Sequence, residues 1–363
     1  DPRQPVGTAS SGVISREDGM VKCGWPLIAA GMLLLPGTGA AQASSSGALA
    51  APNQSCMPVT QANADASAGT ANVQHDGTAL PGIAFPDISQ GFRGIPRSAQ
   101  PPLTASQHRI LECTYFLDEA NAEMPYTLFI PSTYDPSTPT PLVVDLHGLN
   151  ITPLMQILFD GTTDLAERHG FIVVAPMGYS VSGGWGARAG NPVETARVKP
   201  GGEVRYRSGE LSEIDAMTVL AVIRDNFSID DDRIYLMGHS MGGGGTYHLG
   251  GKYSNIWAGL VPLAGAGGIR DAESAERFRG LPMLIMHGEF DSIVSAAGSR
   301  RSVMWLQSVG AQHLYIEVPG VDHEFWIRRG AENMEKVFLF FDTVSKRTNI
   351  GFVTENMIRS GGH

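Results

Sequence analysis

The chain has 363 residues, of which 42% are hydrophobic and 17% are charged, a composition typical of a globular protein with a sizeable core. Its formal net charge of −10 argues against a nucleic-acid-binding protein and against binding to an anionic membrane surface. Beyond residue 43, no apolar run is long enough for a transmembrane helix, so we expect no membrane span.

The first 43 residues have the pattern of processing sequence. Residues 20–22 (Met-Val-Lys) provide an initiator methionine and a positive charge, and residues 25–36 form a short apolar segment. Residues 41–43 (Ala-Gln-Ala) match a signal-peptidase site. We therefore expect upstream read-through followed by a signal peptide at about residues 20–43, and a periplasmic or secreted protein. A disordered apolar N-terminus is the alternative interpretation.

Two cysteines remain after the predicted cleavage site, Cys56 and Cys113. In an exported protein such a pair is a candidate disulfide, here joining an N-terminal extension to the first strand, and two unpaired thiols are the alternative. The sequence has no C-x-x-C motif and no histidine cluster that indicates a metal site. We expect no metal and no cofactor.

Residues 44–106 are rich in Ala, Ser, Gly, Gln and Pro without sustained periodicity, which indicates a low-complexity linker or N-terminal extension. A folded domain is predicted over residues 107–346, and residues 347–363 form a tail. The domain opens with two strand-like segments, 109–118 and 124–130, which predict an antiparallel hairpin.

Short apolar strands and helical patterns alternate after this hairpin. The predicted strands are 142–146, 171–175, 234–237, 257–263, 282–286 and 314–318. The predicted helices are 153–169, 213–227, 243–253, 296–309 and 331–344, and Ser212 is the predicted N-cap of the second helix. This alternation predicts an α/β fold with a mostly parallel twisted sheet of about eight strands and helices on both faces. Ligands bind to such sheets at the carboxyl ends of the strands, where polar and Gly residues gather in this sequence.

A G-x-S-x-G motif spans residues 238–242, between the predicted strand 234–237 and the helix that follows. A serine on such a sharp strand-to-helix turn has a strained backbone, and side chains two residues away would clash, so glycines are needed there. We predict that Ser240 is a nucleophile. A glycine-rich turn with an idle serine is the alternative.

A serine hydroxyl needs a base beside it and a third group that orients the base. His323 follows the last predicted strand and is the predicted base. Asp291 lies between Ser240 and His323 in the chain and is the predicted acid, with Glu289 and Asp322 as rivals.

Three other histidines lie near the predicted site. His239 adjoins the nucleophile, but we expect its side chain to point away from the turn. His147 and His287 each precede a glycine at a strand end and are expected to shape loops by hydrogen bonding.

The oxyanion of an acyl-transfer reaction needs two backbone N–H donors. Met241 is the first candidate, because it follows the nucleophile at the start of a helix. Leu149 is the second, because Gly148 lets the backbone of its loop approach closely. An ordinary strand-to-helix turn is the alternative for that loop.

With these motifs in order over residues 142–344, the sequence resembles the α/β-hydrolase superfamily. More narrowly, it resembles exported bacterial esterases grouped with feruloyl esterases and polyhydroxybutyrate-depolymerase-like enzymes, through the His-Gly loop at 147–148, the elbow Gly-His-Ser-Met-Gly-Gly, His-Gly-x-x-Asp and Asp-His. The resemblance implies a serine carboxylesterase that cleaves small-molecule or polymer esters through an acyl-enzyme, among them aromatic (feruloyl-type) or short-acyl esters. The sequence departs from lipases, because it has neither their triple-glycine loop nor a long lid.

A 32-residue insertion, residues 179–210, is the main candidate for substrate contacts. Trp185 is expected to overhang the serine, Trp326 to form the opposite wall, and Tyr179 to belong to the same pocket. Plain packing is the alternative for both tryptophans. Residues 199–203 predict a small hairpin inside the insertion.

Two rival functions share these features. A serine peptidase of the prolyl-oligopeptidase type uses the same catalytic groups, but it usually carries a propeller domain, for which residues 44–106 are too few. A non-catalytic binding protein on the same fold is the second rival, which the intact order of serine, aspartate and histidine disfavours.

Overall fold

The computed structural model describes residues 54–69, 102–193, 198–199, 202–203, 205–324 and 330–348. The predicted signal peptide, residues 20–43, and residues 349–363 of the predicted tail lie outside the described residues. Among the described helices, none combines the length and the apolar composition needed to cross a bilayer.

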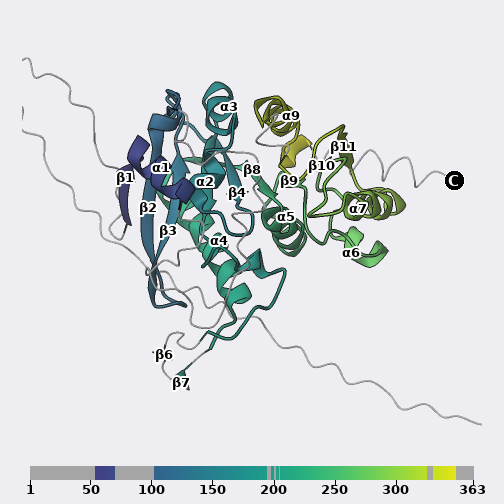
Figure 1. The fold of residues 1–363 in the computed structure, drawn as a ribbon, viewed down its shortest axis with the longest axis horizontal. Helices are drawn as coiled ribbons and strands as arrows, with labels where there is room; N and C mark the ends of the chain where they lie inside the picture. The colour runs from purple at the N-terminus through teal and green to yellow at the C-terminus, as the bar shows by residue number, and fades with distance from the viewer. Residues whose placement is uncertain are drawn as a thin grey trace, which may run out of the picture. The chain divides into compact units, whose positions relative to one another are not determined.

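A nine-stranded sheet organises the described part of the chain (Figure 1), with the strand order β1-β2-β3-β5-β4-β8-β9-β10-β11. The first three strands are antiparallel to their neighbours, and every pair from β5 onward is parallel. The strands are β1 (Gln54–Pro58), β2 (Ile110–Leu117), β3 (Ala122–Phe129), β4 (Thr140–Leu146), β5 (Ile172–Pro176), β8 (Ile229–His239), β9 (Gly259–Leu263), β10 (Met283–Gly288) and β11 (His313–Val318). A separate small hairpin joins β6 (Val198–Lys199) and β7 (Gly202–Glu203), where the sequence predicted one.

Helices pack against both faces of this sheet (Figure 1). The buried residues of one face include those of α4 (Ser208–Asn226), α5 (Met241–Lys252), α6 (Ala272–Glu276) and α7 (Ala297–Ser308). The buried residues of the other include those of α1 (Gln61–Gly69), α2 (Pro153–Ile157), α3 (Thr162–His169) and α9 (Gly330–Thr343). Two short 3₁₀ helices, η2 (Gln107–Arg109) and η3 (Gly184–Gly186), complete the described elements.

The inner parallel strands β4, β5, β9 and β10 are buried on both faces, which explains why their sequences are mostly apolar, whereas β11 at the edge is only partly buried. In β4, Val144 packs with the α4 side and Val143 with the α9 side, because successive side chains of a strand point to opposite faces. All seven residues of β4 are buried. The α/β fold predicted from the alternating pattern is therefore confirmed.

Three details differ from the sequence prediction. The sheet gains a strand, β1, from the segment interpreted as a linker. The single helix expected over residues 153–169 is two helices, and α3 begins after Gly161, whose φ of 84° favours glycine. Helix α4 begins at Ser208 with Arg207 at its N-cap, so Ser212 is not a cap and instead accepts a hydrogen bond from the Trp185 amide at 2.9 Å.

The predicted disulfide between Cys56 and Cys113 is present. The two cysteines are directly opposite each other in the antiparallel pair of β1 and β2, with their Cα atoms 4.0 Å apart. The bond therefore fixes β1 to the edge of the sheet in one register. The signal in the sequence was the cysteine pair alone, because the residues around Cys56 have no strand pattern.

Candidate active site

Ser240 occupies the turn between β8 and α5, at the carboxyl edge of the parallel strands. Its backbone angles of φ 57° and ψ −112° are strained for a residue with a side chain. The neighbouring β9 segment holds this conformation, because the Ser240 amide donates to Leu263 O at 2.8 Å and Ser240 O accepts from the Ala266 amide at 3.1 Å. The turn is thus the strained strand-to-helix turn that the motif predicts.

The two glycines of the motif are required by the closeness of the surrounding backbone. A Cβ atom on Gly242 would lie 1.9 Å from Leu146 O, and a Cβ atom on Gly238 would lie 2.6 Å from Gly242 O. Neither distance is possible for a real side chain. The helix that follows Ser240 can therefore start directly against β4 only because both positions are glycine.

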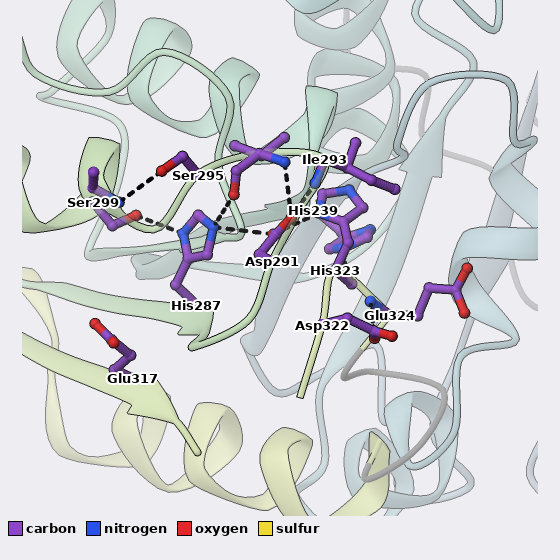
Figure 2. Close-up of polar contacts among 12 residues, drawn as sticks. His239, His287, Asp291, Ile293, Ser295, Ser299, Glu317, Asp322, His323 and Glu324 are labelled. Atoms are coloured by element: carbon purple, nitrogen blue, oxygen red, sulfur yellow. Dashed lines mark hydrogen bonds and ion pairs between the residues drawn. The ribbon is translucent and has the colours of Figure 1, made fainter. Parts of the chain in front are cut away.

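Asp291 and His323 meet as predicted (Figure 2). Asp291 lies in the loop after β10, and His323 lies in the loop after β11. The Nδ1 atom of His323 is 2.7 Å from Asp291 Oδ2, and both residues are buried. This contact has the geometry in which a carboxylate fixes the tautomer and orientation of an imidazole.

The carboxylate of Asp291 has more partners than this one. Its Oδ1 atom accepts from the amides of Ile293 at 2.9 Å and Val294 at 2.8 Å, and His287 Nε2 lies 3.1 Å from Oδ2. Burial by itself raises the pKa of Asp291, but the hydrogen bonds from His287, His323 and the Val294 amide hold it well below the ordinary value. Asp291 is therefore a carboxylate at any pH near neutrality.

His239 is placed differently from the prediction. Its ring packs against the ring of His323, with centroids 4.7 Å apart, and its Nε2 atom lies 3.0 Å from His323 O. Burial, together with the neighbouring imidazole of His323, lowers the pKa of His239 to about 3. An uncharged His239 can therefore hold the His323 loop beside the serine turn without adding a second positive charge.

The two rival acids accept hydrogen bonds from backbone amides of the loops around the site. Glu289 accepts a hydrogen bond from the Gly320 amide at 3.0 Å, and Asp322 accepts one from the Glu324 amide at 3.1 Å. The His323 ring is bonded to the carboxylate of Asp291, at 2.7 Å. Its loop position, five residues after Met286, is the signal that the sequence offered.

The loop after β4 lies directly against the serine. A Cβ atom on Gly148 would be 3.6 Å from Ser240 Cβ and 3.5 Å from His239 O, distances of ordinary contact. His147 anchors this loop, since its ring nitrogens lie 2.8 Å from Gly148 O and 2.8 Å from Met177 O. Leu149, the next residue, therefore stands beside the turn, and its role as an oxyanion donor stays a prediction.

The prediction for Trp185 is wrong. Its side chain is fully buried, its indole N–H donates to His147 O at 3.2 Å, and its ring packs on the His147 ring with centroids 4.8 Å apart. Gly178 and Gly245 make room for it, because a Cβ atom on either would come within 2.6 Å of Trp185. The tryptophan supports the loop after β4 from within the core, which is where a large ring with a satisfied N–H is stable.

The other two predicted pocket residues have different outcomes. Trp326 lies outside the described residues. Tyr179 is half-buried at the carboxyl end of β5, with a φ of 62°, and its amide donates to Asp215 Oδ2 at 2.9 Å. Its place at that edge of the sheet agrees with a substrate contact, which stays a prediction.

Large apolar side chains are exposed on the loops that carry the site. Leu149 is 51% exposed, and Phe290 and Ile293, on either side of Asp291, are each 66% exposed. We call these three side chains the apolar rim. Leu149 was predicted only as a backbone donor, and Phe290 and Ile293 were not predicted, because the exposure of an apolar residue in a loop cannot be inferred from the sequence.

Within the described ranges, no group of three or more His, Cys, Asp or Glu side chains is arranged to hold a metal ion.

The chain is similar to known esterases and hydrolases. Residues 118–314 match the family model named Esterase. Over 168 residues the chain is 27% identical to a bifunctional acetylxylan esterase/xylanase from Neocallimastix patriciarum, covering 46% of this chain and 21% of that protein. Over 153 residues it is 29% identical to S-formylglutathione hydrolase from Rattus norvegicus, covering 39% of this chain and 52% of that one. The matches thus span about a fifth and about half of these relatives.

Among solved structures, a thermostable esterase superposes with a TM-score of 0.51 at 27% identity, over 65% of this chain and 63% of that chain.

Proposed function

The chain belongs to the esterase family and has the α/β-hydrolase fold, and we propose that it is a serine carboxylesterase with Ser240, His323 and Asp291 as its catalytic residues. The observation that carries this proposal is the 2.7 Å contact between His323 Nδ1 and the buried carboxylate of Asp291, next to a strained serine turn. The contact leaves Nε2 of His323 as the nitrogen that exchanges a proton with the serine.

The reaction follows from the roles of these groups. His323 takes the proton of Ser240 as the hydroxyl attacks the ester carbonyl, and Asp291 stabilises the imidazolium that forms. The amides of Met241 and Leu149 bind the oxyanion of the tetrahedral intermediate. His323 then protonates the leaving alcohol, and a water molecule, activated in the same way, hydrolyses the acyl-enzyme.

The substrates that we propose are carboxylic esters of aromatic, feruloyl-type acids or of short-chain acids, on small molecules or polymers. The exposed apolar rim supports an ester with an apolar part, because Phe290 and Ile293 offer it contact area beside Asp291. Tyr179 and Trp326 complete the proposed pocket. The fungal relative is named as an acetylxylan esterase, which is consistent with an ester of a short acid.

We also propose that the protein is exported to the periplasm or secreted. The disulfide between Cys56 and Cys113 supports this location, because such bonds persist in oxidising compartments. The test is expression in a bacterial host with its export machinery, followed by intact mass measurement. Export with cleavage after Ala43 is expected, and retention of the protein in the cytoplasm would contradict the proposal.

The catalytic proposal is tested with the Ser240→Ala variant and a panel of esters. Loss of the nucleophile should lower kcat for p-nitrophenyl acetate on the order of 10⁴-fold to 10⁶-fold and abolish covalent labelling by a fluorophosphonate. Ser308→Ala, at an exposed serine of α7, is the matched control and should retain full activity.

Including methyl ferulate and a peptide amide in the panel separates the esterase proposal from the peptidase rival. Labelling at a residue other than Ser240 would reassign the nucleophile. Cleavage of the peptide amide in preference to every ester would replace the esterase by a peptidase.

A further inference from the structure

A second buried histidine contacts the catalytic carboxylate from the side opposite the base (Figure 2). His287 is at the carboxyl end of β10, and its side chain has no exposed surface. Its Nε2 atom lies 3.1 Å from Asp291 Oδ2 and 2.7 Å from Val294 O, and its Nδ1 atom lies 2.8 Å from Ser299 Oγ on α7. All the hydrogen-bonding capacity of this ring is thus directed at the loop that holds Asp291 and at one serine.

These partners determine the tautomer of His287. A carbonyl oxygen and a carboxylate oxygen can only accept, so the Nε2 atom, which faces both, must carry a proton. In the neutral ring, Nδ1 is then an acceptor, and the hydroxyl of Ser299 can donate to it. The two acceptors at Nε2 therefore fix the tautomer in which His287 donates toward Asp291, and the Ser299 hydroxyl anchors the other ring nitrogen.

The contact fixes the orientation of the carboxylate. The Oδ1 atom of Asp291 is held by the amides of Ile293 and Val294, and Oδ2 is shared by two imidazoles, those of His287 and His323. Without the donor from His287, the backbone amides still hold one oxygen, but the other depends on His323 alone. A rotation of the carboxylate would then move Oδ2 away from the Nδ1 atom that it must orient.

We propose that His287 is a positioning residue, which holds the carboxylate of Asp291 in the plane that orients His323 and whose ring is itself anchored by Ser299. The inference rests on the proposed function, since it assigns a role within the same catalytic apparatus. A misplacement of catalytic groups by about 1 Å can lower a rate on the order of 100-fold. We therefore expect loss of the His287 donor to lower kcat by about 10-fold to 100-fold.

Two substitutions separate the two nitrogens of the ring. His287→Gln places an amide N–H near the position of Nε2 and so keeps a donor for Asp291. His287→Asn is one carbon shorter, places its amide near the position of Nδ1, and leaves Asp291 without this partner. Both variants lose the ring and its packing, so urea unfolding should show similar losses of stability in the two.

The measurement is kcat and KM for p-nitrophenyl acetate in the full-length protein. We expect His287→Asn to lower kcat by about 10-fold to 100-fold with little change in KM, and His287→Gln to recover most of that loss. Equal losses in the two variants would reduce His287 to a packing residue and overturn the inference. Full activity in both would overturn it as well.

A second measurement does not depend on turnover. The proton on His323 Nδ1, bonded to Asp291, is expected to give a downfield proton NMR resonance. This resonance should shift in His287→Asn and stay near its wild-type position in His287→Gln, whereas an unchanged resonance in His287→Asn would count against the inference.

Ser299→Ala covers the case in which neither variant folds, since it keeps the imidazole and removes only the hydroxyl that anchors its Nδ1 atom. We expect kcat to fall several-fold, and wild-type kcat in Ser299→Ala would overturn the inference. The controls separate this inference from the catalytic proposal. If the wild-type protein hydrolyses no ester, the proposed function fails, whereas an active wild type with an inactive Ser240→Ala and equal His287 variants refutes only the positioning role.

Discussion

Replacing Asp291 with asparagine changes one atom of the site and reverses the hydrogen-bonding role of that atom. The amides of Ile293 and Val294 both donate to Oδ1, so the asparagine must place its oxygen there and its NH₂ group at the position of Oδ2. That NH₂ group then faces Nδ1 of His323 and Nε2 of His287, where the carboxylate accepted. Because two donors cannot bond to each other, His323 must change its tautomer.

The changed tautomer removes the function of the base. With its proton on Nε2, His323 cannot accept the proton of Ser240, and the imidazolium also loses its counter-charge. Substitution of the triad aspartate by asparagine in a serine protease lowers kcat about 10⁴-fold through a wrong tautomer, which corresponds to about 5.4 kcal/mol in the activation free energy. We expect a loss of the same order for Asp291→Asn at pH 7.

The assay is kcat/KM for p-nitrophenyl acetate, with Glu289→Gln and Asp322→Asn as matched controls. These two substitutions make the same change at the rival acids, which contact loop amides, and should lower kcat/KM less than about tenfold. If Asp291→Asn retains more than a tenth of wild-type activity, the reasoning is wrong. If one of the controls shows the large loss instead, that residue is the catalytic acid.

Three further predictions concern stability and substrate preference. Replacing Cys56 and Cys113 by serine should lower the unfolding free energy in urea by up to about 4 kcal/mol, because the bond spans 57 residues of chain, and equal stability would show that β1 is held by other contacts. Burial raises the pKa of Asp145 to about 8. Between about pH 4 and pH 8 the folded state therefore keeps a proton on Asp145 that the unfolded state releases. The wild type should lose stability as pH rises through this range. Asp145→Asn should reduce the loss between pH 5 and pH 8.5 by on the order of 2–4 kcal/mol in urea unfolding, and an equal loss in both proteins would contradict the assignment. Replacing Phe290 and Ile293 by alanine should lower the hexanoate-to-acetate ratio of kcat/KM roughly tenfold for p-nitrophenyl esters, whereas an unchanged ratio would exclude the apolar rim from acyl binding.

The parts of the site that could be predicted are those in which a local backbone constraint requires particular residues at fixed positions in the sequence. Ser240 is recognisable because its strained turn needs glycines at fixed positions on either side. Asp291 and His323 could be found because each follows a predicted strand, and parallel strands end at the same edge of the sheet. In these cases short-range pattern and topology are sufficient.

The parts that could not be predicted depend on contacts between segments distant in the chain. β1 forms because it pairs with β2 and is bonded through Cys56, although the sequence around that residue has no alternation of its own. Trp185 is in the core because two glycines, one in the loop after β5 and one in α5, leave space for its ring. The role of His287 depends on Ser299 and on the direction of a loop carbonyl, neither of which a motif records.

The start of α5 is locally destabilising, but it places backbone groups that the proposed reaction needs. Glycine weakens a helix by about 1 kcal/mol relative to alanine, and the strained backbone of Ser240 costs on the order of 1–3 kcal/mol more. Because residue 242 is glycine, the first turn of α5 can lie very close to β4. A Cβ atom on Gly242 would be 1.9 Å from Leu146 O and 2.8 Å from His147 O. We propose that the same approach places the amide of Met241, which has no acceptor four residues earlier in the helix, near the loop of Leu149. The proposed oxyanion hole, made from two separate elements, needs such an approach, and a side chain at residue 242 would prevent it.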